Sequence, residues 1–222
     1  MDIIEAIRAR KSIRRFEPRP VSKETLWEIL EIATRAPSAI NTQPWKICVI
    51  AGEPLEKIKN GNVEMMAAGV QPDPDVPFDM YEGIYKKRQV EVTMQLFRLM
   101  GIARDEKQKK TAWSQRGMRF FDAPAAIILS VEKSAYSERT FADVTSLAQT
   151  ICLTALNYNL GTCINGQSIL YPDVVRKHVS IPETDVLSLC VAIGHPDVDF
   201  PANKVYTERE PIENNTTWHG FE

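Results

Sequence analysis

The stretch FADVTSLAQTICLTALNY, residues 141–158, is apolar on nearly every side of the helix that its spacing predicts. A helix of this kind is buried in a core or in a subunit interface. Three short apolar runs rich in branched residues predict interior strands, namely WKICVIAG (45–52), AAIILSV (125–131) and LSLCVAIG (187–194). Short strands combined with long helices predict an α+β sandwich, and a three-layer α/β fold is the competing interpretation.

The segment between the first two strands is less regular. NGNVEMMAAGVQPDPDVPFDM, residues 60–80, contains three prolines within positions 72 to 77, which favours a loop or a lid. A helix is predicted after it, with Val90, Met94 and Phe97 on one face.

The chain has 222 residues, of which 44% are hydrophobic, enough for one sizeable core. We therefore interpret residues 1–222 as a single domain, with a variable lid or helical excursion at about 60–115. Residues 200–222 show no periodicity but contain several bulky apolar side chains. This C-terminal extension is expected to wrap over another surface.

Charge and composition exclude several classes of protein. Basic and acidic residues nearly balance, at 27 against 29, which argues against a dedicated nucleic-acid binder. No apolar run approaches the roughly 18 residues of a membrane-spanning helix, and Asp2 and Glu5 stand where a signal peptide carries positive charge. We expect a cytoplasmic protein with no membrane partner. The four cysteines form no CxxC motif and no histidine lies at metal-ligand spacing from them, so no metal site is predicted.

Cations gather in RARKSIRRF, residues 8–16. If the first helix ends near Arg10, Lys11 and Ser12 offer backbone amides and a hydroxyl, while Arg10 and Arg14 are spaced to converge on one anion. A phosphate monoester on a flat, polar ring suits such a pair. A solvated cationic turn is the alternative.

A second motif, RAPSAINTQPWKI at residues 35–47, joins a helix to a strand. Asn and Gln amides both donate and accept hydrogen bonds, as reading the edge of a pyrimidine-like ring requires. An ordinary Asx-type turn is the competing interpretation. The candidate ligand-binding residues of this motif are Pro37, Ser38, Ala39, Asn41 and Gln43.

A third motif, NLGTCINGQ at residues 159–167, contains Gly161 and Gly166, which allow a backbone to approach a planar ligand closely. Its alternative is a simple helix-to-strand turn. The sequence contains no GxGxxG, P-loop, GxSxG or HExxH motif. Any cofactor must therefore be held by a binding motif of another kind.

Taken in order, the three motifs resemble the nitroreductase family of FMN-dependent flavoproteins. The shared pattern is R-x-S-x-R, then P-S-A-x-N-x-Q-P-W, then a buried helix followed by L-G-x-x-x-x-G, and a late R-x-P. The resemblance covers nearly the whole chain. It implies a three-layer α/β/α sandwich with a central, mainly antiparallel sheet. It also implies a homodimer in which the C-terminal extension of each chain reaches over the partner subunit.

The resemblance implies where FMN is held. Arg10, with Lys11 and Ser12, matches positions that hold the phosphate and the ribityl chain. Arg14 matches the position beside N1 and O2 of the isoalloxazine ring. The turn at 37–43 matches the one that lines the flavin from the neighbouring subunit.

Two later segments complete the implied site. Asn165 and Gly166 match the segment whose backbone faces N5, and Arg209 matches a late phosphate-binding arginine. Many relatives place a lysine two residues before that arginine, where this chain has Thr207. Lys204 is the candidate substitute.

The implied activity is that of an NAD(P)H-dependent oxidoreductase with a ping-pong mechanism and a nitroaromatic or quinone-like acceptor. Hydride passes through N5, so no catalytic side chain is needed, and Arg14 favours the reduced flavin electrostatically. Tyr81, Tyr85, Phe120 and Phe121 are candidates to line the open face of the flavin, with core or dimer packing as the alternative.

Other functions stay open at this point. An enone reductase and a reductive dehalogenase of the same fold are the nearest alternatives. Two alternatives belong to other classes of protein. They are a non-catalytic flavin-binding dimer and an RNA-binding module that uses the basic cluster. Reduction of a yellow protein by NADH or NADPH distinguishes an enzyme from a binding module.

Overall fold

An antiparallel sheet forms the centre of the molecule. The computed structural model describes residues 1–78 and 80–221, so position 79 of the predicted lid and position 222 of the predicted extension lie outside it. The sheet has the strand order β1-β2-β4-β3, and each neighbouring pair is antiparallel. Its strands are β1 (Trp45–Ala51), β2 (Ala125–Glu132), β3 (Gly161–Ile164) and β4 (Asp185–Gly194). The α+β class and the antiparallel sheet are confirmed.

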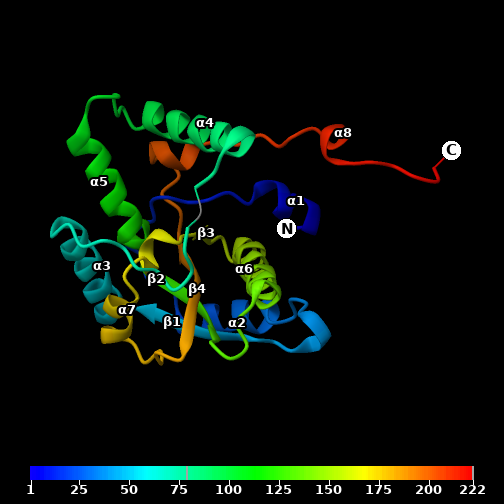
Figure 1. Cartoon of the computed structure of the whole chain (residues 1–222), viewed down its shortest axis with the longest axis horizontal. Helices are drawn as coiled ribbons and strands as arrows, with labels where there is room; N and C mark the ends of the chain where they lie inside the picture. The colour runs from blue at the N-terminus through cyan, green and yellow to red at the C-terminus, as the bar shows by residue number, and fades with distance from the viewer. Residues whose placement is uncertain (79, 222) are drawn as a thin grey trace.

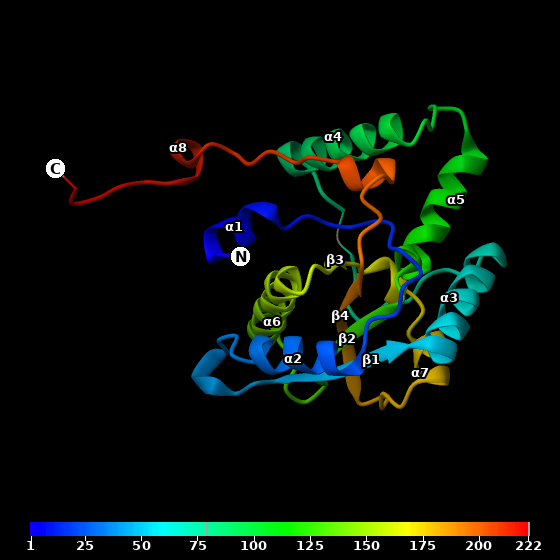
Figure 2. The ribbon, with the colours of Figure 1, turned by 180° about the vertical axis from the view of Figure 1, so that it is seen from behind.

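Helices cover both faces of this sheet (Figures 1 and 2). On one face, α2 (Lys23–Ala33) and α6 (Glu138–Asn157) pack on the odd-numbered residues of β2. On the other face, α3 (Gly52–Ala67) and α7 (Pro172–His178) pack on its even-numbered residues. Because β2 and β4 are buried on both sides, their sequences are continuous apolar runs rather than alternating patterns.

The helix predicted at 141–158 is α6, which begins three residues earlier in a capping box between Ser137 and Thr140. Its side toward the sheet is fully buried along its length, whereas Ala142, Thr145 and Gln149 on other sides are exposed. Within the described part of this chain, α6 is therefore buried on one side only.

The predicted loop at 60–80 begins later than expected, because residues 60–67 form the last turns of α3. Gly61 lies within this helix, where glycine is disfavoured. An added Cβ at Gly61 would lie 2.7 Å from Cγ1 of Val174, so the glycine allows α3 to approach α7 closely. The prolines at positions 72 to 77 predicted a loop correctly for their own positions but not for residues 60–67.

The proline-rich part of this segment is tied to the core. The Asp75 carboxylate forms an ion pair with Arg176 at 2.5 Å and accepts a hydrogen bond from the backbone N–H of Leu187 at 2.8 Å. The hydroxyl of Tyr171 donates to the carbonyl of Val70 at 2.9 Å. Residues 70–75 are therefore a loop fixed at both ends, and any lid begins after them.

A strained turn precedes β2. Phe120, Phe121 and Asp122 all have positive φ angles, of 57°, 55° and 61°, in a region that costs an L-residue about 1–2 kcal/mol. The Asp122 carboxylate pairs with Arg15, Arg116 and Arg119 at 2.9–3.0 Å. These three ion pairs hold the turn, and both phenylalanines are buried beneath it.

The outer elements leave apolar side chains exposed. They are α1 (Ile3–Ala9), α4 (Gly83–Leu99) and α8 (Ile212–Asn215), whereas Trp113 and Met118 of α5 (Lys107–Met118) are at least partly buried. On α4, the predicted apolar face is only partly covered, since Val90 and Met94 are 41% and 58% exposed. Residues 206–211 lie along α4, and the chain then projects outward from the body of the molecule through α8 (Figure 1). Among the described residues, no helix has the length and apolar character needed to span a membrane.

Candidate active site

The cationic segment lies beside the sheet in an extended conformation. Helix α1 ends at Ala9, and Arg10 caps it. Ser12 then forms a parallel bridge with Thr162 of β3, and the N–H of Ile13 donates to the Thr162 carbonyl at 2.9 Å. The first helix therefore ends near Arg10, as the sequence predicted, and the residues that follow it extend the edge of the sheet.

Extended backbone directs alternate side chains to opposite sides. Arg10, Ser12 and Arg14 consequently share one side, while Ile13 on the other side is buried in the core. The ammonium group of Lys11 donates to the carbonyl of Asn203 at 2.7 Å, so Lys11 is held against the short helical turn η4 (Pro201–Lys204). The structure thus separates Lys11 from the three residues with which it was grouped.

Arg14 and Ser12 lie close to the buried thiol of Cys163. Burial raises the pKa of Cys163 to about 11, against the opposing effects of the Arg14 charge and the Ser12 hydroxyl. Burial also raises the pKa of Cys152, and the positive charge of Arg10 opposes this rise. Because Ser12 pairs with Thr162 in parallel, Arg14 lies toward the end of β3 that leads to Asn165 and Gly166, and Arg10 lies toward its start.

Asn203 fixes this segment, although the sequence analysis missed it. Its side-chain oxygen accepts from the N–H of Arg14 at 2.6 Å, and its side-chain nitrogen donates to the carbonyls of Arg15 and Asp197, both at 2.8 Å. Asn203 is 2% exposed. The only available signal was a lone Asn in an irregular stretch, which is too common to single out.

The third motif turns away from β3 at Asn165 and Gly166. Asn165 is buried, and its side-chain nitrogen donates to the carbonyl of Gly117 at 2.8 Å while its oxygen accepts from the N–H of Gln167 at 3.0 Å. With its side chain fully used, Asn165 holds the backbone in place. The N–H of Gly166 has no hydrogen-bond acceptor among residues 1–78 and 80–221.

The second motif forms a strained, exposed turn at the start of α6. The N–H of Ala39 donates to the Asp143 carboxylate at 3.2 Å, and the N–H of Gln43 donates to the Ser38 hydroxyl at 3.0 Å. Three residues of the turn, Ile40, Asn41 and Gln43, have φ angles between 46° and 57°. Ile40 is 95% exposed, which is unusual for a branched apolar residue in this strained conformation.

The turn at 37–43 and the cationic segment meet α6 at different points along the helix. The turn is attached to α6 at Asp143, whereas Arg10 lies near Cys152 on the same helix. Nine residues of α-helix separate these two points by about 13 Å. Asp143 also keeps one buried carboxylate oxygen without a hydrogen-bond partner in the described part of the chain.

Arg209 lies on the segment 206–211 along α4. Its guanidinium donates to the carbonyl and the hydroxyl of Thr207, both at 3.0 Å. The neighbouring Glu210 forms an ion pair with Arg88 of α4, which attaches the segment to that helix. A groove of about 680 Å³ between α4 and residues 206–211 is lined by Arg88 and Arg209. Lys204 is exposed at the end of η4.

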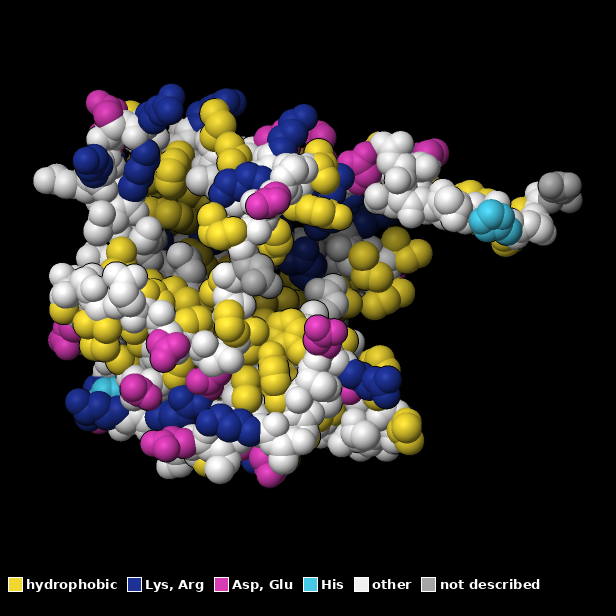
Figure 3. Space-filling model, in the orientation of Figure 1, with side chains coloured by type: hydrophobic (Ala, Val, Ile, Leu, Met, Phe, Trp, Pro, Cys, Tyr) yellow, Lys and Arg dark blue, Asp and Glu magenta, His cyan; other side chains and the backbone are white. Residues whose placement is uncertain are grey.

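The aromatic candidates divide into two pairs. Phe120 and Phe121 belong to the core, at 0% and 5% exposure, so core packing is the correct interpretation for them. Tyr81 and Tyr85 are exposed, at 58% and 64%. On the side where α4 crosses the molecule, Figure 3 shows a hollow with hydrophobic walls and a basic side chain inside it.

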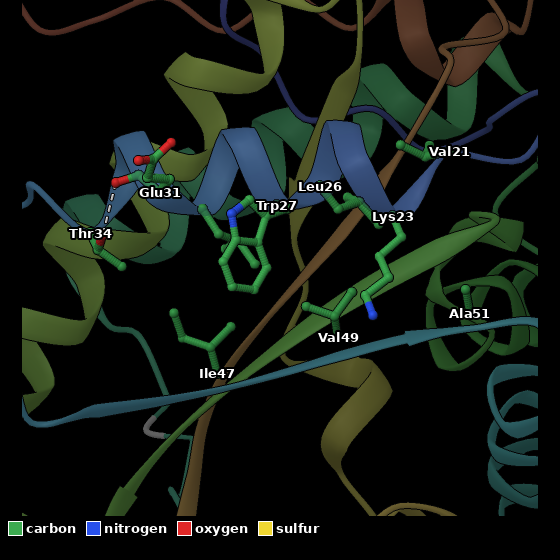
Figure 4. Close-up of a pocket in the computed structure, with 10 residues that line it drawn as sticks. Val21, Lys23, Leu26, Trp27, Glu31, Thr34, Ile47, Val49 and Ala51 are labelled. Atoms are coloured by element: carbon green, nitrogen blue, oxygen red, sulfur yellow. Dashed lines mark hydrogen bonds between the residues drawn. The ribbon is translucent and has the colours of Figure 1, made fainter.

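A second, apolar groove lies between α2 and the edge strand β1, away from the cationic segment. It encloses about 700 Å³. In Figure 4 the ring of Trp27 points across the groove toward Ile47 and Val49. Trp27 is 69% exposed, and β1 pairs only with β2 among the described residues.

Comparison with known proteins shows the family to which the chain belongs. Residues 7–195 match the sequence profile of the nitroreductase family. The chain belongs to the nitroreductase family. It is 31% identical over 220 residues to the nitrobenzene nitroreductase of Ectopseudomonas oleovorans, covering 97% of this chain and 96% of that protein.

Solved structures of this family have the same fold. The FMN and NADPH-dependent nitroreductase NfnB from Sphigopyxis sp. strain HMH superposes with a TM-score of 0.92 at 29% identity, with 100% of both chains covered. The FMN-dependent NfnB from Mycobacterium smegmatis, in complex with NADPH, gives a TM-score of 0.91 at 26% identity, with 97% of both chains covered.

Proposed function

We propose that this nitroreductase-family chain is an FMN-dependent oxidoreductase that takes hydride from NAD(P)H and reduces nitroaromatic or quinone-like acceptors. The observation that carries the proposal is the arrangement along β3. Arg10, Ser12 and Arg14 form a cationic, hydrogen-bonding edge that leads to the N–H of Gly166, which has no acceptor within residues 1–78 and 80–221. The full-length similarity to nitroreductases that use FMN and NADPH supports it.

The donor set fits a phosphorylated flavin. Guanidinium groups and a hydroxyl suit a phosphate and a ribityl chain. Gly166 has no side chain, so a planar ring can approach its backbone, and its N–H is available to a ring nitrogen. Asn165 is buried and fully hydrogen-bonded, which preorganises that N–H.

Bound FMN would supply two-electron chemistry, accepting hydride at N5 and passing it on. The chain contributes electrostatics and positioning. Arg14 stabilises negative charge at the N1 and O2 edge of the ring, and Arg10 with Ser12 holds the phosphate end. Arg209 is assigned to the phosphate as well, with Lys204 in place of the lysine that Thr207 replaces. Lys204 directly follows Asn203, which hydrogen-bonds the cationic segment at Lys11, Arg14 and Arg15.

We propose further that the functional unit is a homodimer with the site at the interface. Within one chain the turn at 37–43 and the cationic segment meet α6 about 13 Å apart, and we assign the turn that lines the flavin ring to the second copy, as the family resemblance implies. The strained, exposed Ile40 and the unpaired oxygen of Asp143 fit an unfinished site.

The C-terminal extension is proposed to occupy the apolar groove between α2 and β1 of the partner. Residues 206–221 reach up to about 50 Å when extended, enough to cross a neighbouring subunit. Trp218 and Phe221 are 66% and 78% exposed and match the apolar lining of that groove. The free edge of β1 offers backbone hydrogen bonds to an added strand.

Steady-state kinetics and anaerobic reduction test the activity. The purified protein, reconstituted with FMN, is expected to be reduced by NADPH or NADH and reoxidised by nitrobenzene or a benzoquinone. Double-reciprocal plots are expected to be parallel, because donor and acceptor use one open face in turn. A protein that binds FMN but resists reduction by both nucleotides contradicts the proposal.

A further inference from the structure

Phe78 lies against the backbone of Gly166. A Cβ built on Gly166 would lie 2.4 Å from Cζ and 3.0 Å from Cε1 of the Phe78 ring. The ring tip therefore touches the place where a side chain would begin, although Phe78 is 65% exposed. Only glycine at position 166 permits this contact, because any other residue would displace the ring.

The position of Phe78 is defined by an anchor three residues before it. The Asp75 carboxylate pairs with Arg176 at 2.5 Å and accepts from the N–H of Leu187 at 2.8 Å. Arg176 also donates to the carbonyl of Asp185 at 2.8 Å, so the anchor is connected to the start of β4. Phe78 is thus at the point where the chain leaves a fixed loop and crosses toward α4 (Figure 1).

We propose that Phe78 forms an aromatic wall of the acceptor site, at the edge of the flavin beside Gly166. This inference rests on the proposed function, because it needs a flavin at the N–H of Gly166. An exposed ring in that position offers an apolar face to a flat, electron-poor aromatic acceptor such as a nitroarene. It also keeps water and small solutes away from the reacting edge.

The wall selects by acceptor class. An aromatic acceptor gains edge-to-face or stacked contact with the Phe78 ring, whereas a small non-aromatic enone gains little. Aromatic contacts correspond to about a 2- to 10-fold change in affinity. Removing the ring is therefore expected to raise KM for nitrobenzene by about 2- to 10-fold and to leave KM for a small enone within about twofold.

Sulfite provides a readout that does not depend on turnover, because it adds reversibly to N5 of an oxidised flavin and bleaches its absorbance. In the FMN-loaded protein, Phe78→Ala is expected to speed sulfite addition several-fold, and Phe78→Leu to have an intermediate effect. Met80→Ala is the matched control, since Met80 is apolar, 81% exposed and two residues away.

The outcomes separate this assignment from the proposed function. If the wild-type protein binds no FMN or is not reduced by NAD(P)H, the proposed function fails and the assignment fails with it. If the wild type is a working flavoenzyme but Phe78→Ala leaves both the sulfite rate and the nitrobenzene KM unchanged, only the assignment is wrong. Equal effects of Met80→Ala, or tighter FMN binding by Phe78→Ala, also overturn it, the latter because the ring would then occupy the place of the flavin.

Discussion

At the scale of single residues, Arg10 and Arg14 share one side of an extended segment but are assigned to opposite ends of FMN. Arg10→Ala removes a hydrogen bond to a charged phosphate, worth about 1.5–3 kcal/mol, and should weaken FMN binding about tenfold or more. Arg14→Ala should instead lower the two-electron potential, because the lost cation stabilised the reduced ring more than the oxidised one. FMN titration and redox titration at saturating FMN measure the two effects.

Arg8→Ala is the control for this pair, since Arg8 is an exposed cation on α1 in the same cluster. It should change neither FMN affinity nor potential. Equal shifts in potential for Arg10→Ala and Arg14→Ala, or none for Arg14→Ala, would remove the electronic role of Arg14.

Asp122 is expected to make a pH-dependent contribution to the stability of the fold. Burial raises its pKa, but the hydrogen bond from Arg119 and the charges of Arg119, Arg116 and Arg15 outweigh burial, so the pKa is lowered overall. A carboxylate whose pKa is lower in the folded state stabilises the fold above its unfolded pKa, near 3.9, and loses that contribution as the pH falls through the folded value.

Asp122→Ala should therefore cost about 2–4 kcal/mol at neutral pH, because three guanidiniums lose their partner and the left-handed turn loses its clamp. Urea unfolding at pH 7 and near pH 3 measures this, and the difference between variant and wild type should shrink at the lower pH. Glu53→Gln, in an exposed pair with Lys57, is the control and should have little effect. A difference that stays constant with pH would contradict the ionic account.

At the scale of elements, the loop at 70–75 is expected to depend on Arg176. Arg176→Ala leaves the half-buried Asp75 carboxylate with only the N–H of Leu187, so the loop should detach from β4. Hydrogen exchange followed by mass spectrometry should then speed up in residues 68–78 and at the start of β4, while α6 stays protected. Lys87→Ala, in an exposed pair on α4, is the control. Unchanged exchange at 68–78 would show that other contacts hold the loop.

The same elements show what the sequence could and could not predict. Long apolar runs such as 125–131 predicted their strands correctly, because burial on both faces leaves a signal in every residue. The four-residue strand β3 gave no such signal, and its edge is completed by residues 10–14, which are far away in sequence. The sequence showed that Arg10 and Arg14 are four residues apart. The extended backbone that follows the end of α1 is what places both side chains on one side. Lys11 was grouped with them because sequence proximity does not reveal that its partner is Asn203.

At the scale of the whole molecule, the exposed apolar surface is arranged on α1, α2, α4 and the C-terminal extension. Ile3, Ile4 and Trp27 are each at least 60% exposed, as are Trp218 and Phe221 of the extension. Exposed apolar residues in these numbers fit the proposed contact with a second copy. The all-round apolar character of α6, used on only one side here, belongs to the same pattern.

Removing residues 212–222, which leaves Arg209 in place, should therefore produce a monomer that binds FMN at least about tenfold more weakly, because the partner's turn at 37–43 no longer completes the site. Sedimentation velocity and FMN titration measure both consequences in one sample. Trp218→Asp in the extension and Trp27→Asp in the α2–β1 groove should each weaken the dimer, since either places a charge in the same apolar contact. Val198→Asp, at a 71% exposed position outside both surfaces, should leave the dimer intact. A full-length monomer loaded with FMN would contradict the shared site, whereas a dimer that tolerates Trp27→Asp but not Trp218→Asp would place the extension on a different surface.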